Sequence, residues 1–314
     1  MQGLTTFYAD MIRYEVEIKK GVWMMRAYEI HEYEDTYKVY ELRETATGSW
    51  FRIVPARGGI VTSYGTAGEE RLYLERETLL DPEANIRGGI PVLFPFSGFV
   101  TEGSYEWNGQ RYSIKNHGVA RNHAWTVERT GEDRGVFIVL TLRANEQTLA
   151  SFPFDFELRF TYRLLDGKLT IEQEYVNYSE EPMPMYPGFH PYFLADRKEA
   201  HYRTDADLLF DFNDHQVKPY EGSINLDELP ESVVFQNAKE PVIGVTFDGR
   251  QHVEMTYSGT FRFVVLWSIK GKPFICVEPW MAMPDEINRK QELTFVPTGK
   301  SVLAELVIES TSAS

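Results

Sequence analysis

Apolar and polar residues alternate along much of this chain. From Phe156 to Leu164 every even-numbered residue is apolar or aromatic, and every odd-numbered residue is charged or polar. A period of two predicts a strand with one face in the core and the other in water. Asp166-Gly167 then precedes a second strand-like run, Lys168 to Val176, and the two runs together predict a β-hairpin.

Helical periodicity is rare by comparison. Leu72 to Leu80 predicts about two helical turns ended by Asp81-Pro82, and Asn225 to Leu229 predicts about one. The 16 prolines and 23 glycines separate the strand-like runs at the intervals expected of a large antiparallel sandwich. The predicted fold class is therefore all-β, a large antiparallel β-sandwich. Further strands are predicted at Phe51–Val54, Gly59–Tyr64, Val136–Arg143, Val253–Tyr257, Phe261–Trp267, Phe274–Val277 and Val302–Ile308.

The length of the chain favours one domain spanning residues 1–314. A chain of 314 residues allows two domains, but large all-β folds often run this long as one unit. No linker, low-complexity tract or fixed-period repeat separates two halves. Residues 1–37 fit the pattern least, and an N-terminal extension there is an open alternative.

Charge and hydropathy restrict the partners. The formal charge of −15 argues against nucleic acid and acidic membranes, because their phosphates would be repelled. No apolar run approaches the roughly 18 residues of a membrane helix. Residues 1–20 contain Asp10, Glu15 and Glu17 without a continuous apolar stretch, so no signal peptide is predicted. We expect a cytoplasmic monomer or homodimer that binds a small molecule.

Cys276 is the only cysteine, which excludes a disulfide within the chain and a cluster of thiolate metal ligands. Its neighbours, Phe274-Ile275 and Val277, predict a buried strand. We therefore expect Cys276 to be a core residue and not a nucleophile.

His190 lies between Pro187 and Pro191 in an aromatic segment. Proline donates no hydrogen bond to a central sheet, so His190 is predicted in a loop or at a strand end. The aromatic neighbours Tyr186, Phe189, Tyr192 and Phe193 could wall a pocket for a sugar, whose axial C–H bonds form an apolar patch. A histidine satisfied by backbone groups in a packed loop is the alternative.

Glu278 follows the buried run Phe274–Val277 and precedes Pro279-Trp280. A carboxylate at the end of a buried strand is partly desolvated, which raises its pKa and makes it a stronger base. A structural ion pair with an arginine is the alternative interpretation.

His117 and Arg121 flank Gly118-Val119-Ala120, and Arg87 precedes Gly88-Gly89. Arginine can make fork-like hydrogen bonds to hydroxyls or to an anion, and the glycines let a backbone approach closely. Each arginine could equally be solvated or ion-paired. Neither a metal-binding His spacing, a phosphate-binding glycine loop nor a GxSxG elbow is present, so no metal or cofactor is expected. His31, His123, His201, His215 and His252 are expected at the surface.

From about Thr45 to the C-terminus the chain resembles the aldose 1-epimerase (galactose mutarotase) family. The motifs that carry the resemblance occur in the family's order. They are Arg87-Gly88-Gly89-Ile90-Pro91 with Phe94-Pro95, Asn116-His117-Gly118-Val119-Ala120-Arg121 followed by Trp125, Gly188-Phe189-His190-Pro191-Tyr192-Phe193, and Cys276-Val277-Glu278-Pro279-Trp280.

The resemblance implies a β-supersandwich and interconversion of the α and β anomers of a hexose or hexose 6-phosphate. His190 resembles the general acid that protonates the ring oxygen, and Glu278 resembles the base that takes the proton from the C1 hydroxyl. His117 resembles the histidine that holds or assists at the ring oxygen. Arg87 and Arg121 resemble arginines that contact sugar or phosphate, and Trp280 and Phe94 are expected to shape the pocket. Because each positioned acid or base supplies roughly 10² to 10⁴ in rate, such a pair is expected to suffice without a cofactor or metal.

Several alternatives stay open at this stage. The family's pocket aspartate has no decisive match, and Asp205, Asp207 and Asp211 are its candidates. A carbohydrate-binding or sensor protein that kept the pocket is one rival function. A glycoside hydrolase or lyase is another; it would normally need a second carboxylate, and Asp285 and Glu286 are expected to be solvated.

Overall fold

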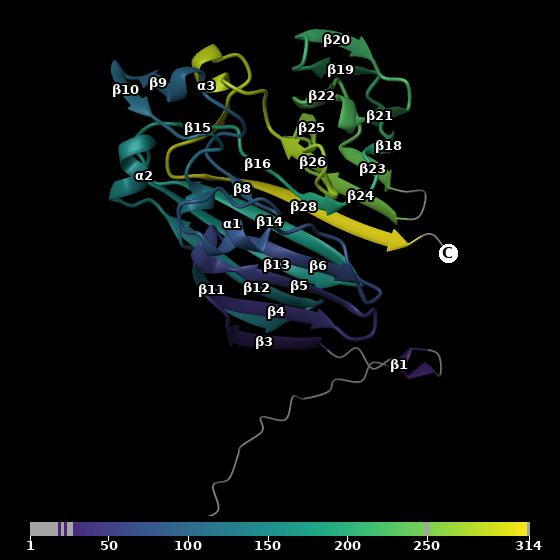
Figure 1. Ribbon diagram of the computed structural model, residues 1–314. Helices are drawn as coiled ribbons and strands as arrows, with labels where there is room; N and C mark the ends of the chain where they lie inside the picture. Colours follow the sequence, from purple (N-terminus) through teal and green to yellow (C-terminus); the bar gives the residue numbers. More distant parts are fainter. Residues whose placement is uncertain (1–17, 20–21, 24–27, 248–250, 313–314) are drawn as a thin grey trace, which may run out of the picture.

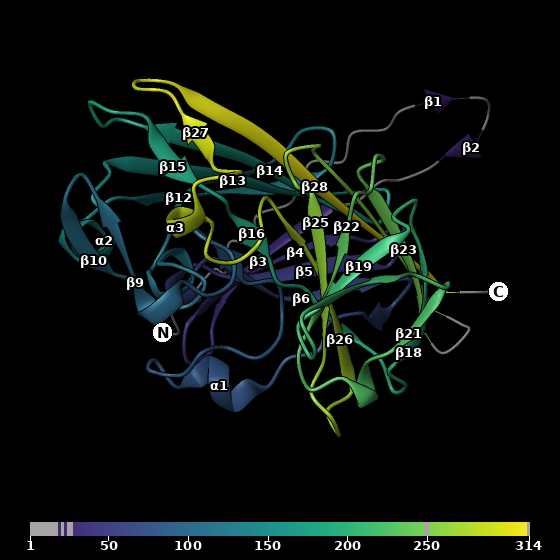
Figure 2. The ribbon, with the colours of Figure 1, turned by 90° about the horizontal axis from the view of Figure 1, so that it is seen from above.

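The computed structural model describes residues 18–19, 22–23, 28–247 and 251–312. Most strands belong to three antiparallel sheets (Figure 1). A nine-stranded sheet runs through the molecule, a five-stranded sheet packs against one part of it, and an eight-stranded sheet packs against the other (Figure 2). The predicted all-β sandwich is confirmed.

The nine-stranded sheet has the order β11-β12-β13-β14-β28-β24-β23-β18-β21. Its strands are β11 (Thr126–Glu132), β12 (Val136–Arg143), β13 (Phe156–Leu165), β14 (Lys168–Asn177), β28 (Ser301–Ser312), β24 (Gln251–Tyr257), β23 (Val242–Phe247), β18 (Glu199–Arg203) and β21 (Ser223–Asn225).

The eight-stranded sheet has the order β20-β19-β22-β25-β26-β16-β8, with β17 also paired to β26. Its strands are β20 (Gln216–Pro219), β19 (Leu208–Asp211), β22 (Val233–Gln236), β25 (Phe263–Trp267), β26 (Phe274–Trp280), β16 (Gly188–Phe189), β8 (Val92–Leu93) and β17 (Tyr192–Leu194).

The five-stranded sheet and three short hairpins or pairs complete the β-structure. The five-stranded sheet contains β3 (Tyr28–Glu34), β4 (Lys38–Glu44), β5 (Ser49–Val54), β6 (Ile60–Thr66) and β7 (Glu69–Glu70). The pairs are β1 (Ile18–Lys19) with β2 (Val22–Trp23), β9 (Ser104–Trp107) with β10 (Gln110–Ser113), and β15 (Met183–Met185) with β27 (Thr294–Val296).

Helices are short. They are α1 (Arg76–Leu80), α2 (Glu146–Ser151) and α3 (Glu286–Arg289), with 3₁₀ turns at Pro55–Arg57, Thr101–Gly103, Ala120–Asn122 and Leu226–Glu228. The helix predicted from Leu72 is wrong in its first half, because Leu72 and Leu74 are extended and bridge Phe193 and Gly88. Long-range strand contacts overrode the local pattern there.

The predicted hairpin is confirmed. Leu165 pairs with Lys168 across Asp166-Gly167, whose φ angles of 52° and 77° are both positive. Two left-handed residues give a turn whose twist matches that of the flanking strands. The even-numbered residues of β13 are buried, in agreement with the alternation.

One large apolar cluster joins all three sheets, with Phe51, Phe160 and Phe235 among its members. Within the described part of the chain, no helix has the length and apolar character needed to cross a membrane. The signal-peptide prediction for residues 1–20 and the prediction for residues 1–37 fall mostly outside the described residues.

Candidate active site

Two loops that carry predicted site residues are fastened to each other. The His117 backbone N–H donates to the Gly98 carbonyl at 2.9 Å, and the Gly98 N–H donates to His117 Nδ1 at 3.1 Å. The Val119 N–H donates to the Phe94 carbonyl at 2.7 Å. Gly118 has φ +75° and a Cβ there would lie 2.2 Å from the Phe94 oxygen, so only glycine fits this approach. The sequence thereby fixes the His117 ring in place.

β26 contributes three side chains to one face of the eight-stranded sheet. Cys276, Glu278 and Trp280 are two residues apart, and successive side chains of a strand alternate between faces. The strand does not stop before Pro279 as predicted; it continues to Trp280, which lies opposite Gly188 of β16. A Cβ on Gly188 would lie 2.6 Å from the Trp280 ring, so this glycine makes room for the indole.

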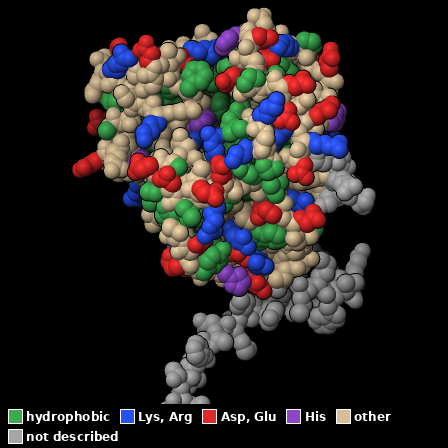
Figure 3. Space-filling model, viewed as in Figure 1, with side chains coloured by type: hydrophobic (Ala, Val, Ile, Leu, Met, Phe, Trp, Pro, Cys, Tyr) green, Lys and Arg blue, Asp and Glu red, His purple; other side chains and the backbone are tan. Residues whose placement is uncertain are grey.

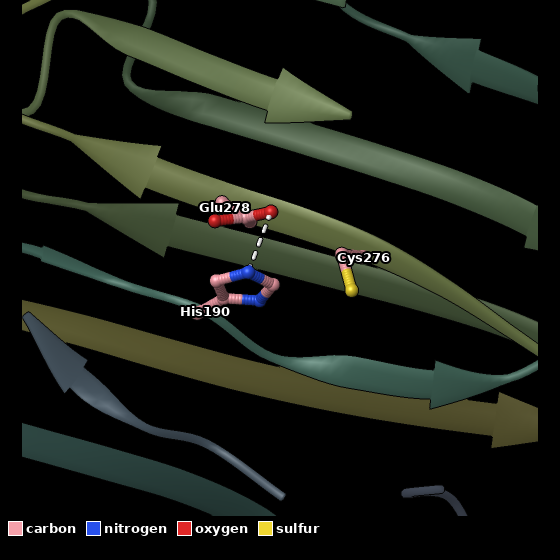
Figure 4. Close-up of side chains that lie close together, drawn as sticks. All are labelled: His190, Cys276 and Glu278. Carbon is pink, nitrogen blue, oxygen red and sulfur yellow. Dashed lines mark ion pairs between the residues drawn. The ribbon is translucent and has the colours of Figure 1, made fainter. Parts of the chain in front are cut away.

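His190 occupies the two-residue link between β16 and β17, as predicted from the flanking prolines. Its backbone N–H donates to the Pro91 carbonyl at 3.1 Å. Its ring stacks on Tyr192 with centroids 4.6 Å apart and meets the Trp267 ring edge-on at 5.9 Å. In this position His190 Nε2 lies 3.4 Å from Glu278 Oε1 (Figure 4).

A cavity of about 340 Å³ opens above this pair. Six of the seven predicted site residues line it: His117, His190, Glu278, Arg87, Arg121 and Trp280. The volume lies within the range of about 300–1,000 Å³ typical of small-molecule sites. Residues up to 193 positions apart (87 to 280) therefore line one cavity, so the motifs meet in space.

Phe94 is the exception. Its side chain is fully buried and packs on Phe152, Phe156 and Tyr175 in the core, away from the cavity lining. The prediction that Phe94 shapes the pocket wall is therefore wrong. The backbone carbonyl of Phe94, and not its ring, contacts the loop that carries His117.

Burial controls the protonation of the histidines and of Glu278. Burial and, to a smaller extent, the Arg121 charge together lower the pKa of His117 to about 3. His190 is 7% exposed, and burial, His117 and Arg121 hold its pKa well below the usual value. Glu278 is 2% exposed, and burial raises the pKa of its carboxyl well above the usual value, against the opposing effects of Trp280 and Arg121. The uncharged forms of all three are favoured.

The tautomer of His117 follows from its hydrogen bond. Nδ1 accepts from the Gly98 N–H, so it carries no proton, and the proton of a neutral ring resides on Nε2. His117 is therefore a hydrogen-bond donor through Nε2. Its ring meets that of His190 edge-on at a centroid distance of 5.5 Å.

Arg121 is half-buried, and among the described residues no hydrogen bond or ion pair joins its guanidinium to a carboxylate. Arg87 is exposed at the mouth of the same cavity. On the face in Figure 3, Lys and Arg side chains gather beside a hollow in which a histidine is visible. A chain of net charge −15 thus presents positive charge at this cavity.

Sequence reasoning missed several lining residues. Asn85, Glu231 and Trp267 also face the cavity, but none lies in a motif that could have pointed to it. The three aspartates considered for the pocket do not line it. Asp205 accepts from backbone N–H groups of Lys239 and Glu240, Asp207 accepts from Asn237, and Asp211 pairs with Lys218. Glu231 is the acidic residue found there besides Glu278.

Of the remaining predictions about burial, some are confirmed and others are wrong. Cys276 is buried as expected, and His31, His201 and His215 are exposed. His123 and His252 are only half-exposed, and His123 Nδ1 contacts the Val119 carbonyl at 2.9 Å, so the surface assignment is wrong for these two. Glu286 is fully buried, and Asp285 accepts from the Thr101 N–H and hydroxyl, so neither is simply solvated.

Comparison with known proteins gives consistent results. A provisionally named glucose-6-phosphate 1-epimerase of Cenchrus ciliaris is 33% identical over 196 residues, which is 59% of this chain and 54% of that protein. The chain thus spans about half the length of that relative. Protein LacX of Lactococcus lactis subsp. lactis is 26% identical over 275 residues, 78% of this chain and 89% of that protein.

Among solved structures, a protein of Synechocystis sp. PCC 6803 is 31% identical with a TM-score of 0.85, covering 91% of this chain and 100% of that one. A galactose mutarotase related enzyme of Lactobacillus acidophilus, at 22% identity and a TM-score of 0.72, covers 91% and 98% and supports the fold alone. The family model described as aldose 1-epimerase matches residues 52–309. The chain therefore belongs to the aldose 1-epimerase family.

Proposed function

We propose that this protein interconverts the α and β anomers of a hexose 6-phosphate, with Glu278 and His190 as the acid–base pair. The observation that carries the proposal is the 3.4 Å contact between His190 Nε2 and Glu278 Oε1 beside a cavity of monosaccharide size. Opening a cyclic hemiacetal requires a proton to leave O1 while another reaches the ring oxygen. These two oxygens share one carbon, so the groups that serve them must be neighbours.

In the proposed reaction the Glu278 carboxylate takes the O1 proton, and protonated His190 delivers a proton to the ring oxygen. The ring C–O bond breaks and the C1–O1 bond becomes the carbonyl of a free aldehyde. Rotation about C1–C2 presents the other face, and the same two groups act in reverse to close the ring. Each positioned acid or base contributes roughly 10² to 10⁴ in rate.

The reactive pair needs one transferable proton. Burial favours the uncharged arrangement, with the proton on Glu278 and none added to His190. Transfer across the 3.4 Å contact converts this into carboxylate and imidazolium, the form the reaction uses. His117, a neutral donor through Nε2, is suited to a hydrogen bond with the ring oxygen or a neighbouring hydroxyl.

The finer proposal, a phosphorylated substrate, rests on charge. Arg121 and Arg87 line the cavity with no carboxylate partner among the described residues, and arginine suits bidentate contacts to phosphate. The name of the Cenchrus ciliaris relative points to the same substrate class. Aromatic rings of Trp267 and Trp280 line the cavity near the pair and could pack on the apolar face of a sugar.

The test uses His190→Asn, with His201→Asn as the matched control because His201 is exposed on β18. Anomer exchange is followed by NMR on glucose 6-phosphate and by polarimetry on freshly dissolved α-glucose and α-galactose. We expect His190→Asn to lower kcat at least about 100-fold with sugar binding retained, and His201→Asn to leave it unchanged. Unaltered exchange in His190→Asn would remove this residue from the mechanism.

The same experiment separates the rival functions. Saturable binding of sugars by the unaltered protein without faster anomer exchange would identify a binding or sensor protein. Release of reducing ends from an oligosaccharide would identify a hydrolase. Faster exchange of free hexose than of hexose 6-phosphate, at equal concentrations, would refute the phosphate proposal while keeping the epimerase.

A further inference from the structure

The proposed acid–base pair has a third neighbour that the reaction does not use. Cys276 lies two residues before Glu278 on β26, and the side chains of both emerge from the same face. Cys276 Sγ, His190 Nε2 or Nδ1 and a Glu278 oxygen all lie within 4.8 Å of one another (Figure 4). A thiol, an imidazole and a carboxylate therefore converge from one strand and the neighbouring β16–β17 link.

These three groups retain free ligand capacity. His190 Nδ1 and Glu278 Oε2 are buried and, among the described residues, have no hydrogen-bond partner. Cys276 is fully buried and Glu278 is 2% exposed. Buried polar atoms are normally satisfied, so two side chains that keep unpartnered atoms beside a thiol are not committed to a structural hydrogen-bond network.

We propose that Cys276, His190 and Glu278 form a binding site for a thiophilic divalent cation such as Zn²⁺ or Cd²⁺, and that its occupancy blocks epimerisation. Cysteine sulfur, histidine nitrogen and carboxylate oxygen are the ligands that zinc prefers. Zinc bonds of about 2.0–2.2 Å to nitrogen and oxygen fit the 3.4 Å separation of Nε2 and Oε1.

Two side chains at the site can supply negative charge to the cation, whereas two nearby arginines repel it. A thiolate and a carboxylate together neutralise a divalent ion, and the protons they lose leave to solvent. Arg121 and Arg87 line the adjoining cavity and oppose the positive charge, whereas His117 is neutral. Three protein ligands leave a fourth position for water from the cavity. Bound in this way, the metal holds the lone pairs that would otherwise move the substrate protons.

The experiment titrates the full-length protein, after treatment with a chelator and its removal, with CdCl₂ in the absence of substrate. A cadmium–thiolate charge-transfer band in the ultraviolet, saturating at one ion per chain, is the expected result. Because this readout involves no sugar, it stands even if the proposed epimerase activity fails. Absence of the band in the unaltered protein would overturn the proposal.

The second readout is the anomer-exchange rate in increasing ZnCl₂. We expect Cys276→Ala and Cys276→Ser to keep the rate of the unaltered protein without metal, and to raise the zinc concentration for half-inhibition about tenfold or more, since even an outer-shell change costs that much. MgCl₂ should have no effect, because Mg²⁺ requires oxygen ligands. His31→Ala removes the exposed His31–Glu29 pair, a competing site, and should leave the inhibition unchanged. Equal zinc inhibition in both Cys276 variants would place the ion elsewhere and refute the site.

Discussion

Glu278 and Glu286 are eight residues apart in sequence and both are buried, yet their surroundings differ. One oxygen of Glu286 accepts the backbone N–H groups of Gln291 and Glu292, and the other has no hydrogen bond among the described residues but lies 3.5 Å from the Arg289 guanidinium. Glu278 has a contact of 3.4 Å with His190, and its second oxygen has no hydrogen-bond partner among the described residues. Two backbone donors and the Arg289 cation therefore engage the Glu286 carboxylate, whereas the Glu278 carboxylate keeps its capacity for a ligand.

Two arginines repeat this contrast. Arg57 is buried and donates to five backbone carbonyls, which fastens the segment from α1 to residue 84 that precedes Arg87. Arg121 lies beside Arg57 around a small cavity, but no such bonds are found for its guanidinium in the described part of the chain. Burial alone therefore does not identify a functional charge. A buried charged group with unsatisfied hydrogen-bonding capacity is a better indication of function, because leaving that capacity unsatisfied costs stability.

The largest expected effect is a difference in anomer-exchange rate between the glutamine variants of Glu278 and Glu286. Glu278→Gln removes the proposed base, so kcat for anomer exchange should fall at least about 100-fold. Glu286→Gln, the matched change, should leave the rate near that of the unaltered protein, because Glu286 does not line the cavity. NMR exchange on glucose 6-phosphate measures both.

The same pair of variants should behave in the opposite way in stability. Glu286→Gln weakens charge-assisted hydrogen bonds to two backbone N–H groups, which costs roughly 1–3 kcal/mol of unfolding free energy. Urea unfolding measures this cost. A Glu286→Gln protein as inactive as Glu278→Gln, yet fully stable, would end the comparison.

The two arginines give the next largest effect. Arg121→Ala should lower kcat/KM for hexose 6-phosphate about 10- to 100-fold through KM, since a hydrogen bond to a charged group contributes about 1.5–3 kcal/mol. Free hexose should be less affected. Arg57→Lys should instead lower the urea midpoint, because an ammonium cannot span five carbonyls. Steady-state kinetics with both sugars measures these changes. An equal loss of kcat/KM for phosphorylated and free hexose in Arg121→Ala would contradict a phosphate contact.

The sequence was a good guide wherever chemistry is local. Alternation predicted β13, Asp166-Gly167 predicted the hairpin, and the prolines around His190 placed it outside a strand interior. The motifs also named six residues that line one cavity. Each of these features depends on neighbouring residues or on a family resemblance.

Sequence reasoning failed where the partner is distant along the chain. Phe94 was expected in the pocket, but packing on Phe152 and Phe156 takes its ring into the core. Glu286 was expected in solvent, because nothing in its segment reveals that the chain turns back to present two N–H groups. Glu231 reaches the cavity from the loop before β22, a placement that only the assembled sheet determines. Burial and partner choice arise from tertiary packing, which the pattern of one strand does not contain.

The smallest effect is the contribution of Glu278 to the dependence of stability on pH. Burial raises its folded pKa above the unfolded value, so the folded state holds this proton more tightly, and stability is lost as pH rises from the unfolded pKa through the folded one. Glutamine does not titrate, so the stability of Glu278→Gln relative to the unaltered protein should grow as pH rises from about 4.5. Each pKa unit of difference corresponds to about 1.4 kcal/mol.

Thermal unfolding of both proteins between acidic and alkaline pH measures the trend, with Glu286→Gln as the control for losing a buried carboxylate. A stability difference between Glu278→Gln and the unaltered protein that is constant with pH would mean that Glu278 is not desolvated, and would remove the physical basis for distinguishing it from Glu286.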